Sequence, residues 1–309
     1  MIDTYLRRKF MNKRFARVAL IAISLIFLSA CDDRPENDPL AKNPSTTWVI
    51  QNALIYDGTG GEPFNGNIRI TDGKISEIGS IEATTGEKAW DAKGLVLAPG
   101  FIDPHSHHDT KLMKKPAPAS ALGQGITTIV SGLDGGASTF GAPFVSIEHS
   151  MSIFEQNPAA LNLAYFAPHD TYREIVMGED FKRAASDDQL DQMIGMLERD
   201  LKSGALGLST GLEYEPSLYS TTEEVVALAK VAAKYGGKYT SHIRSEDVKV
   251  GAAIEEVLTI AREANIPANI SHIKLAMYEL FGGSSDILKK LNDARAAGLD
   301  ITAAIYPYD

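Results

Sequence analysis

The sequence has little cysteine, no excess of basic residues and no long apolar run. Its 309 residues contain one cysteine, which excludes a disulfide-stapled scaffold and a cysteine-rich zinc module. Lysine and arginine number 30 against 40 acidic residues, and this net charge of −10 argues against nucleic-acid binding, which needs a basic surface. No internal repeat and no glycine-rich phosphate loop is present. With 44% apolar and 23% charged residues, the chain is expected to form one large acidic domain with a small accessory module.

The first 30 residues are typical of a bacterial export signal. Six basic residues precede the apolar run Val18–Leu28, which at 11 residues is too short to span a hydrocarbon core of about 30 Å. The segment that ends at Cys31 resembles a lipobox, which implies cleavage after residue 30 and acylation of Cys31. An ordinary signal peptide, or a membrane anchor with a chance cysteine, is the alternative.

Cleavage changes the charge of the chain. Without residues 1–30, 24 basic and 39 acidic residues remain, a net charge of −15. Anionic lipid repels such a body, so we expect membrane attachment through the lipid anchor only. The expected location is the bacterial cell envelope, facing the periplasm.

Residues 31–97 are predicted to form an extended segment followed by a small β-module. Residues 31–47 carry three prolines among polar residues and are typical of a tether. Short strands separated by turn dipeptides are predicted within residues 48–97: Trp48–Tyr56, Asn67–Thr71 and Lys74–Ile78. About fifty residues of this kind make a β-module rather than a full domain.

Over residues 98–309, predicted strands alternate with predicted helices. Helices are expected after two capping-box patterns and at two further segments: Ser186-x-x-Gln189, Ser220-x-x-Glu223, Val248–Ala264 and Asp286–Ala297. Seven strands are expected: Gly100–His105, Thr127–Ser131, Leu161–Phe166, Leu206–Ser209, Lys238–His242, Ala268–His272 and Asp300–Tyr306. Repeated strand–helix units favour an α/β fold with a parallel sheet. Polar residues at the carboxyl ends of many strands favour an incomplete (β/α)8-type barrel over a doubly wound sheet.

Four of the seven histidines lie at the ends of predicted strands. His105 and His107 are two residues apart, so their side chains face the same side of a strand. His242 and His272 each end a later strand. One such histidine is usually a hydrogen-bonded core residue. Several at successive strand ends favour a metal site, because converging imidazoles suit a borderline transition metal.

These histidines belong to longer blocks that resemble the amidohydrolase superfamily. Residues 98–107, APGFIDPHSH, resemble its first-strand signature. Four further blocks resemble, more narrowly, the N-acyl-D-amino-acid deacylases (D-aminoacylases): GALGLSTGLxYxP at 204–216, where x is any residue, SHIRSE at 241–246, SHIK at 271–274 and YPY at 306–308. The HxH pair alone is a weak signal, but five blocks in the family's order are a specific one, and the similarity covers Trp48–Asp309.

The resemblance implies a metal-binding role for five residues. His105 and His107 would hold one metal position, and His242 and His272 the other, tighter one. Asp134 stands where the deacylases have a cysteine ligand, and the alternative for it is a turn residue flanked by glycines. One or two zinc ions are expected. Because a carboxylate is a harder ligand than a thiolate, manganese, cobalt or iron fit this site better than a site with a cysteine ligand.

The resemblance also suggests how substrate is held. Lys274 and Tyr214 would engage the carboxylate of the substrate, and the alternative for Lys274 is a rim lysine paired with a glutamate. Arg244 and Glu246 share one face under strand alternation, so we expect a buried ion pair between them.

Three further residues are expected to support the site. His108 and Asp109 are expected to hydrogen-bond the ligand imidazoles. His169, at the end of the third predicted strand, is expected either beside the ligands or facing the substrate.

The implied reaction is hydrolysis of the amide bond of small-molecule N-acyl-D-amino acids. In the family, an Asp at the end of strand eight transfers the proton. We expect that residue beyond Asp309 and expect the chain to be a fragment, which leaves the activity of these 309 residues open. The alternatives are another amidohydrolase, such as a cyclic amidase or a dipeptidase, and a non-catalytic lipoprotein that binds an acyl amino acid.

Overall fold

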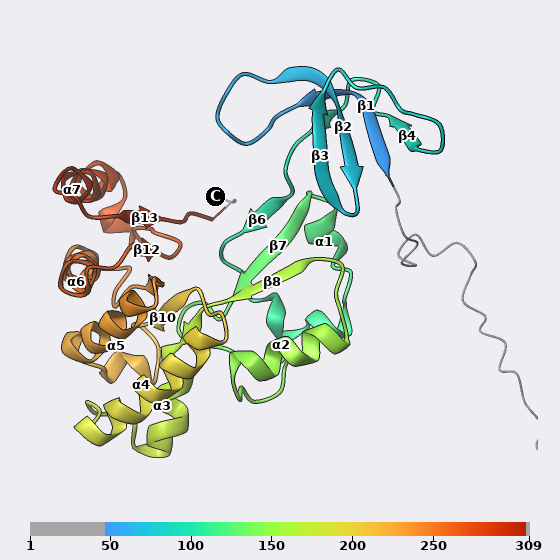
Figure 1. Ribbon diagram of the computed structural model, residues 1–309. Coiled ribbons are helices and arrows are strands. Elements are labelled where there is room, and N and C mark those ends of the chain that lie inside the picture. The colour runs from blue at the N-terminus through green and yellow to red at the C-terminus, as the bar shows by residue number, and fades with distance from the viewer. Residues whose placement is uncertain (1–46, 307–309) are drawn as a thin grey trace, which may run out of the picture. The chain divides into compact units, whose positions relative to one another are not determined.

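The computed structural model describes residues 47–306, which divide into two units (Figure 1). The first unit comprises residues 47–55 and 63–97, and the second comprises residues 56–62 and 98–306. The predicted signal peptide, Cys31, the tether apart from Thr47, and residues 307–309 lie outside the described residues. Between residues 47 and 306, no helix is both long and apolar enough to cross a membrane.

The first unit is a five-stranded sheet. Its strands are β1 (Trp48–Ile55), β2 (Phe64–Thr71), β3 (Lys74–Gly79), β4 (Lys88–Asp91) and β5 (Val96–Leu97). They lie in the order β3-β2-β1-β4, and β5 pairs with β1. The turn Asp72-Gly73 joins β2 to β3 with both residues at positive φ, as a tight hairpin requires. The three predicted strands are present, although β2 begins at Phe64 rather than at Asn67. Residues 56–62, predicted as part of this module, group with the second unit.

Eight parallel strand segments build the second unit. They are β6 (Phe101–Asp103), β7 (Ile126–Ser131), β8 (Asn162–Tyr165), β9 (Ala167–Pro168), β10 (Gly207–Gly211), β11 (Lys238–His242), β12 (Ala268–Ile270) and β13 (Ile301–Ala303). Strands β6-β7-β8 form one sheet and β9 to β13 the other, with neighbours in chain order. Only Phe166 separates β8 from β9, so the two segments are parts of one nearly continuous strand. Its first part pairs within the sheet of β6 and β7, and its second part pairs with β10. This chain-order succession of parallel strands is that of a (β/α)8-type barrel, as predicted.

Helices follow the strands of the second unit and cover the outer side of the sheet formed by β9 to β13 (Figure 1). The α-helices are α1 (Ala119–Leu122), α2 (Ile147–Gln156), α3 (His169–Met177), α4 (Asp187–Lys202), α5 (Thr222–Lys234), α6 (Val250–Ala264) and α7 (Ser284–Ala296). Short 3-10 helices are η1 (His108–Thr110), η2 (Leu112–Lys114), η3 (Gly178–Asp180), η4 (Ser217–Tyr219) and η5 (Tyr278–Leu280). Fully buried Leu208, Leu228, Tyr239, Val257 and Ile270 belong to the core between these layers.

One predicted helix start is confirmed and one is shifted. Ser186 and Gln189 form the predicted capping box of α4. At α5 the cap is Thr221, whose hydroxyl accepts the backbone N–H of Glu224, whereas the hydroxyl of Ser220 donates to a carbonyl of η4. The predicted cap at Ser220 was therefore wrong by one residue.

Three strands end earlier than expected, and two of them carry predicted ligands. β6 ends at Asp103 rather than at His105, and β12 ends at Ile270 rather than at His272. β13 ends at Ala303 instead of continuing to Tyr306. The backbone of His272 has a positive φ of 32°, which takes it out of the strand ladder. His105, His107, Asp134 and His272 thus lie on the loops that leave the strands, whereas His242 is the last residue of β11.

Candidate metal centre

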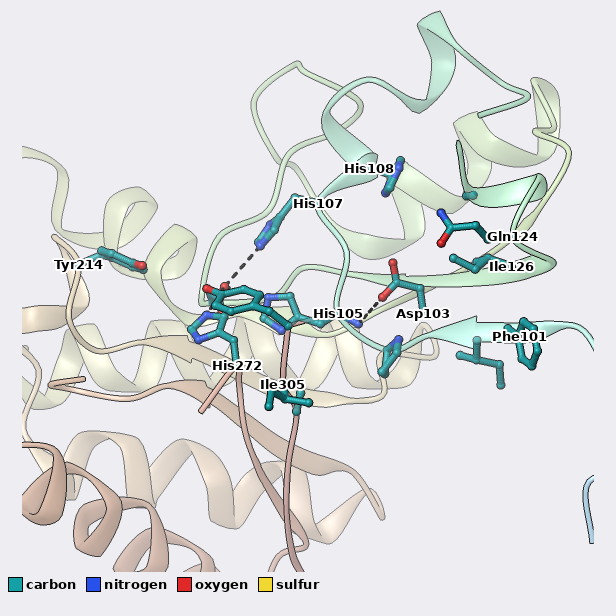
Figure 2. Close-up of a pocket in the computed structure, with 16 residues that line it drawn as sticks. Phe101, Asp103, His105, His107, His108, Gln124, Ile126, Tyr214, His272 and Ile305 are labelled. Atoms are coloured by element: carbon teal, nitrogen blue, oxygen red, sulfur yellow. Dashed lines mark hydrogen bonds and ion pairs between the residues drawn. The ribbon is translucent and has the colours of Figure 1, made fainter. Parts of the chain in front are cut away.

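Five predicted ligands converge at the carboxyl ends of the parallel strands. We name them the strand-end cluster: His105, His107, Asp134, His242 and His272. Figure 2 labels His105, His107 and His272 among them. Asp134 is central, because its Oδ2 lies 3.0 Å from Nε2 of His105 and 3.4 Å from Nε2 of both His107 and His272. His242 joins through Nδ1, which lies 3.1 Å from Nε2 of His272.

The cluster contains two overlapping sets of possible metal ligands. One set is His105, His107 and Asp134, and the other is Asp134, His242 and His272. Within each set, the candidate ligand atoms lie within 4.8 Å of one another. The sequence resemblance implied His105 and His107 at one position, and His242 and His272, joined by Asp134, at the other.

A strained loop presents Asp134 to the imidazoles. Asp134 itself has a φ of 53°, and Gly132 and Gly135 on either side have φ of 74° and 75°. A Cβ at Gly132 would lie 2.2 Å from the carbonyl oxygen of Phe166, so glycine is required there. Asp134 is therefore a glycine-flanked turn residue and also a candidate ligand, since the turn is what aims its carboxylate.

Two buried polar atoms of the cluster have no hydrogen-bond partner among residues 47–306. They are Oδ1 of Asp134 and Nδ1 of His105. Such atoms are costly unless something satisfies them. Because imidazole nitrogens and a carboxylate are the donors that divalent zinc accepts, the cluster fits such an ion.

The electrostatics of the cluster favour an ionised carboxylate. Burial alone would raise the pKa of Asp134, but hydrogen bonds with His105, His107 and His272 outweigh burial and hold that pKa well below its usual range. Burial would lower the pKa of His272, but Asp134 and Glu246 raise it to about 9. A negative charge at the centre of four imidazoles is a favourable place for a cation.

Lys274 contacts a glutamate beside the cluster. Its Nζ donates to Oε1 of Glu246 at 2.5 Å and lies 3.1 Å from Nδ1 of His272. The alternative of a lysine paired with a glutamate is thus the contact present. The predicted Arg244–Glu246 pair is wrong, because Arg244 pairs with Glu256 at 2.8 Å. β11 ends at His242, so strand alternation does not extend to these residues.

Tyr214 lies on the loop after β10 and lines the cavity at the cluster. Its hydroxyl is 3.1 Å from Nδ1 of His242. Partial burial and nearby carboxylates raise the pKa of Tyr214 to about 12, so the hydroxyl keeps its proton at neutral pH. The cavity has a volume of about 950 Å³, and His105, His107 and Asp134 also line it (Figure 2).

The two residues that follow His107 do not make the predicted bonds. Nδ1 of His108 lies 2.6 Å from the hydroxyl of Ser106, and Asp109 accepts the backbone N–H of Ser138 at 3.4 Å. Asp109 acts on His107 through its charge instead. The hydrogen bond with Asp134 raises the pKa of His107, and Asp109 adds to this shift.

His169 neither lies beside the ligands nor faces the cavity. It is fully buried, with its two ring nitrogens 2.9 Å from Glu224 and 3.0 Å from the hydroxyl of Ser217. Arg173 and Asp170 complete this arrangement. We name it the buried network: His169, Asp170, Arg173, Ser217 and Glu224. A histidine at a strand end was an insufficient signal here, because its partners come from η4 and α5.

Sequence reasoning missed the role of two glutamates. Oε2 of Glu213 lies 2.9 Å from Nε2 of His242, and Oε1 of Glu246 lies 2.9 Å from Nδ1 of His272. Glu213 directly precedes Tyr214, which is the one hint that the sequence offers. No spacing rule applies to Glu246, which lies on an irregular loop.

Comparisons with known proteins identify the family of the chain. Residues 88–300 match the amidohydrolase family. The chain is 32% identical over 280 residues to D-aminoacylase and 34% identical over 277 residues to N-acyl-D-glutamate deacylase, both from Alcaligenes xylosoxydans xylosoxydans. Each alignment covers 84% of this chain but only 57% and 56% of the relative, so the chain spans little more than half their length.

A solved structure shows the same fold. The structure of N-acyl-D-glutamate deacylase from Bordetella bronchiseptica, complexed with zinc and a phosphonate inhibitor, superimposes with a TM-score of 0.80 at 34% identity. The match covers 86% of this chain and 59% of that one.

Proposed function

Because the chain belongs to the amidohydrolase family, we propose that it carries the metal centre of a hydrolase that cleaves the amide bond of N-acyl-D-amino acids. The observation that carries this proposal is the convergence of four imidazoles on Asp134, with Lys274 and Tyr214 beside them. The relatives are named D-aminoacylase and N-acyl-D-glutamate deacylase, and the similarity of this chain to them supports N-acyl-D-amino acids as the substrate class.

The strand-end cluster would hold one or two zinc ions. His105, His107 and Asp134 would form one position, and Asp134, His242 and His272 the other. Manganese, cobalt or iron would also suit a centre whose shared ligand is a carboxylate. A bound ion supplies Lewis-acid polarisation of the acyl carbonyl and a nucleophile at neutral pH.

The side chains around the cluster would bind and orient the substrate. Lys274 offers a positive charge to the substrate carboxylate, and its contact with Glu246 keeps the ammonium group beside His272. Tyr214 donates a hydrogen bond because its hydroxyl stays protonated. We propose, from the family resemblance, that the carboxylate that transfers the proton to the leaving nitrogen is an Asp beyond Asp309.

We also propose that the mature protein is an acylated lipoprotein of the cell envelope, facing the periplasm. The segment that ends at Cys31 supports this location. Cys31→Ser should abolish incorporation of labelled palmitate and release the protein from membranes. Equal labelling of variant and wild type would contradict the proposal.

The test of the catalytic proposal is amine release from N-acetyl-D-methionine and N-acetyl-L-methionine by the zinc-loaded product of the complete gene. We expect turnover of the D enantiomer. Lys274→Met should lower kcat/KM about 10–100-fold, the value of a charge-assisted hydrogen bond. Lys289→Met is the matched control, because this exposed lysine pairs only with Asp293 on α7. Turnover of neither enantiomer at full metal occupancy would favour another amidohydrolase or a binding lipoprotein.

A further inference from the structure

The two most buried histidines of the strand-end cluster each use both ring nitrogens. Nδ1 of His242 faces His272 at 3.1 Å, and its Nε2 lies 2.9 Å from Oε2 of Glu213. Nε2 of His272 faces Asp134 at 3.4 Å, and its Nδ1 lies 2.9 Å from Oε1 of Glu246. Each imidazole therefore turns one nitrogen toward the cluster and the other toward a carboxylate.

The other metal position is supported differently. Nε2 of His105 faces Asp134 at 3.0 Å, but its Nδ1 is buried without a hydrogen-bond partner. The side chain of His107 is 58% exposed. Side chains of His242 and His272 are only 3% and 7% exposed, so a partner on the second nitrogen has a larger effect on them.

A carboxylate on the far nitrogen of a ligand imidazole has two consequences. It fixes which nitrogen carries the proton, and it raises the basicity of the nitrogen that faces the metal. Removing such a partner typically weakens metal binding about 10–100-fold. Glu246 has a further effect here, because its Oε1 also accepts from Lys274 and so links a metal ligand to the substrate side of the cavity.

We propose that Glu213 and Glu246 are positioning residues that orient His242 and His272 and strengthen metal binding at the position these histidines share with Asp134. The proposal rests on the metal centre of the proposed function but not on the identity of the substrate. It predicts that the two metal positions respond differently to loss of the glutamates.

The experiment is zinc titration of the full chain against a competing chelator, together with the visible spectrum of the cobalt-substituted protein. Glu213→Ala should weaken zinc binding at the tighter position about 10–100-fold and shift the cobalt absorption bands. Glu213→Gln should weaken it less, because the amide oxygen still accepts the imidazole N–H. Glu246→Gln tests the second glutamate with minimal disturbance, since this residue is 8% exposed.

Glu215→Gln is the matched control. This exposed glutamate lies two residues from Glu213 and contacts Lys182 and Tyr219, so the same charge change should leave zinc binding and the cobalt spectrum unaltered. Melting of each variant in excess chelator shows whether it folds.

A double-mutant cycle identifies the route of the effect. If Glu213 acts through His242, Glu213→Ala should add nothing to the loss of zinc binding in a His242→Ala background. Additive losses, or a Glu213→Ala protein with wild-type zinc affinity and cobalt spectrum, would overturn the proposal while leaving the metal centre intact. A wild-type protein that binds no metal would overturn both.

Discussion

The strand-end cluster and the buried network both combine histidine with carboxylates, and they differ in whether their polar atoms are satisfied. In the network, Arg173 donates to both oxygens of Glu224 at 2.6 and 2.7 Å and to three backbone carbonyls. No side-chain nitrogen or oxygen of the network is buried without a partner within residues 47–306. In the cluster, two buried atoms, Oδ1 of Asp134 and Nδ1 of His105, have none.

The difference lies in where the positive charge comes from. Arg173 supplies it permanently to the network, and burial lowers the pKa of His169, which keeps that imidazole neutral. Among residues 47–306, no arginine forms an ion pair with the strand-end cluster, and the lysine beside it, Lys274, pairs with Glu246. Four of the five cluster residues line the cavity. A set of histidines and acids thus forms part of a structural core when a protein cation completes it. It becomes a candidate ion site when its polar atoms are left for a ligand.

The largest effect is expected from breaking the network. Arg173→Leu leaves Glu224 buried without its main partner, which should cost about 3–5 kcal/mol of unfolding free energy. Arg183→Leu is the control, since Arg183 and its partner Asp180 are exposed and such pairs contribute about 1 kcal/mol or less. Urea denaturation measures both. Equal losses in the two variants would show that the network is not the structural element described.

A second prediction concerns the centre of the cluster. Asp134→Asn tolerates the positive φ but removes the charge that His105, His107 and His272 share, so zinc affinity should fall at least about 100-fold. The unfolding free energy of the metal-free chain should change less than it does in Arg173→Leu. Calorimetric titration measures the zinc affinity, and urea denaturation measures the unfolding free energy. Unchanged zinc affinity would contradict the role of Asp134 as a ligand.

The two metal positions can be separated by single histidine variants. His242→Ala and His272→Ala should each remove more bound zinc than His105→Ala, because only the former two have a glutamate on the second nitrogen. Elemental analysis after dialysis compares them. Equal zinc content in all three variants would reject the ranking.

The last prediction concerns pH and the network alone. Burial raises the pKa of Asp170 to about 7, above the ordinary value of 3.8. Between about pH 4 and 7 the folded chain therefore holds a proton that the unfolded chain has released. The unfolding free energy should fall as pH rises, by up to about 1.4 kcal/mol per pH unit.

Asp170→Asn isolates that contribution. The variant keeps an oxygen for the N–H of Gly211 and the hydroxyl of Ser217, both of which bond Oδ1 of Asp170. Its unfolding free energy, measured in urea at several pH values, should lack the fall seen in the wild type. Parallel pH profiles of variant and wild type would show that Asp170 does not retain the proton.

Much of the site follows from the sequence because strand ends are regular. His242 ends a parallel strand and His105, His107 and His272 closely follow others, and such strand ends meet at one edge of a barrel. Sequence periodicity says less about Asp134, whose position depends on a glycine loop, and the family resemblance was needed to identify it.

The errors arose where the chain leaves the strands. Arg244, Glu246 and His169 were placed by strand alternation or by a strand-end position, but their partners are set by loops and helices distant in sequence. No sequence pattern predicted the contact of Glu213 with His242. Glu213 lies between two motif positions, and its carboxylate reaches His242 only because of how the loop after β10 folds.

The most direct test of the metal centre is anomalous diffraction at the zinc edge from crystals of the zinc-loaded protein. We predict an anomalous peak about 2.0–2.2 Å from a carboxylate oxygen of Asp134, from Nδ1 of His242 and from Nε2 of His272. Crystals of fully zinc-loaded protein with no peak at these atoms, and with the ion bound elsewhere in the chain, would contradict it.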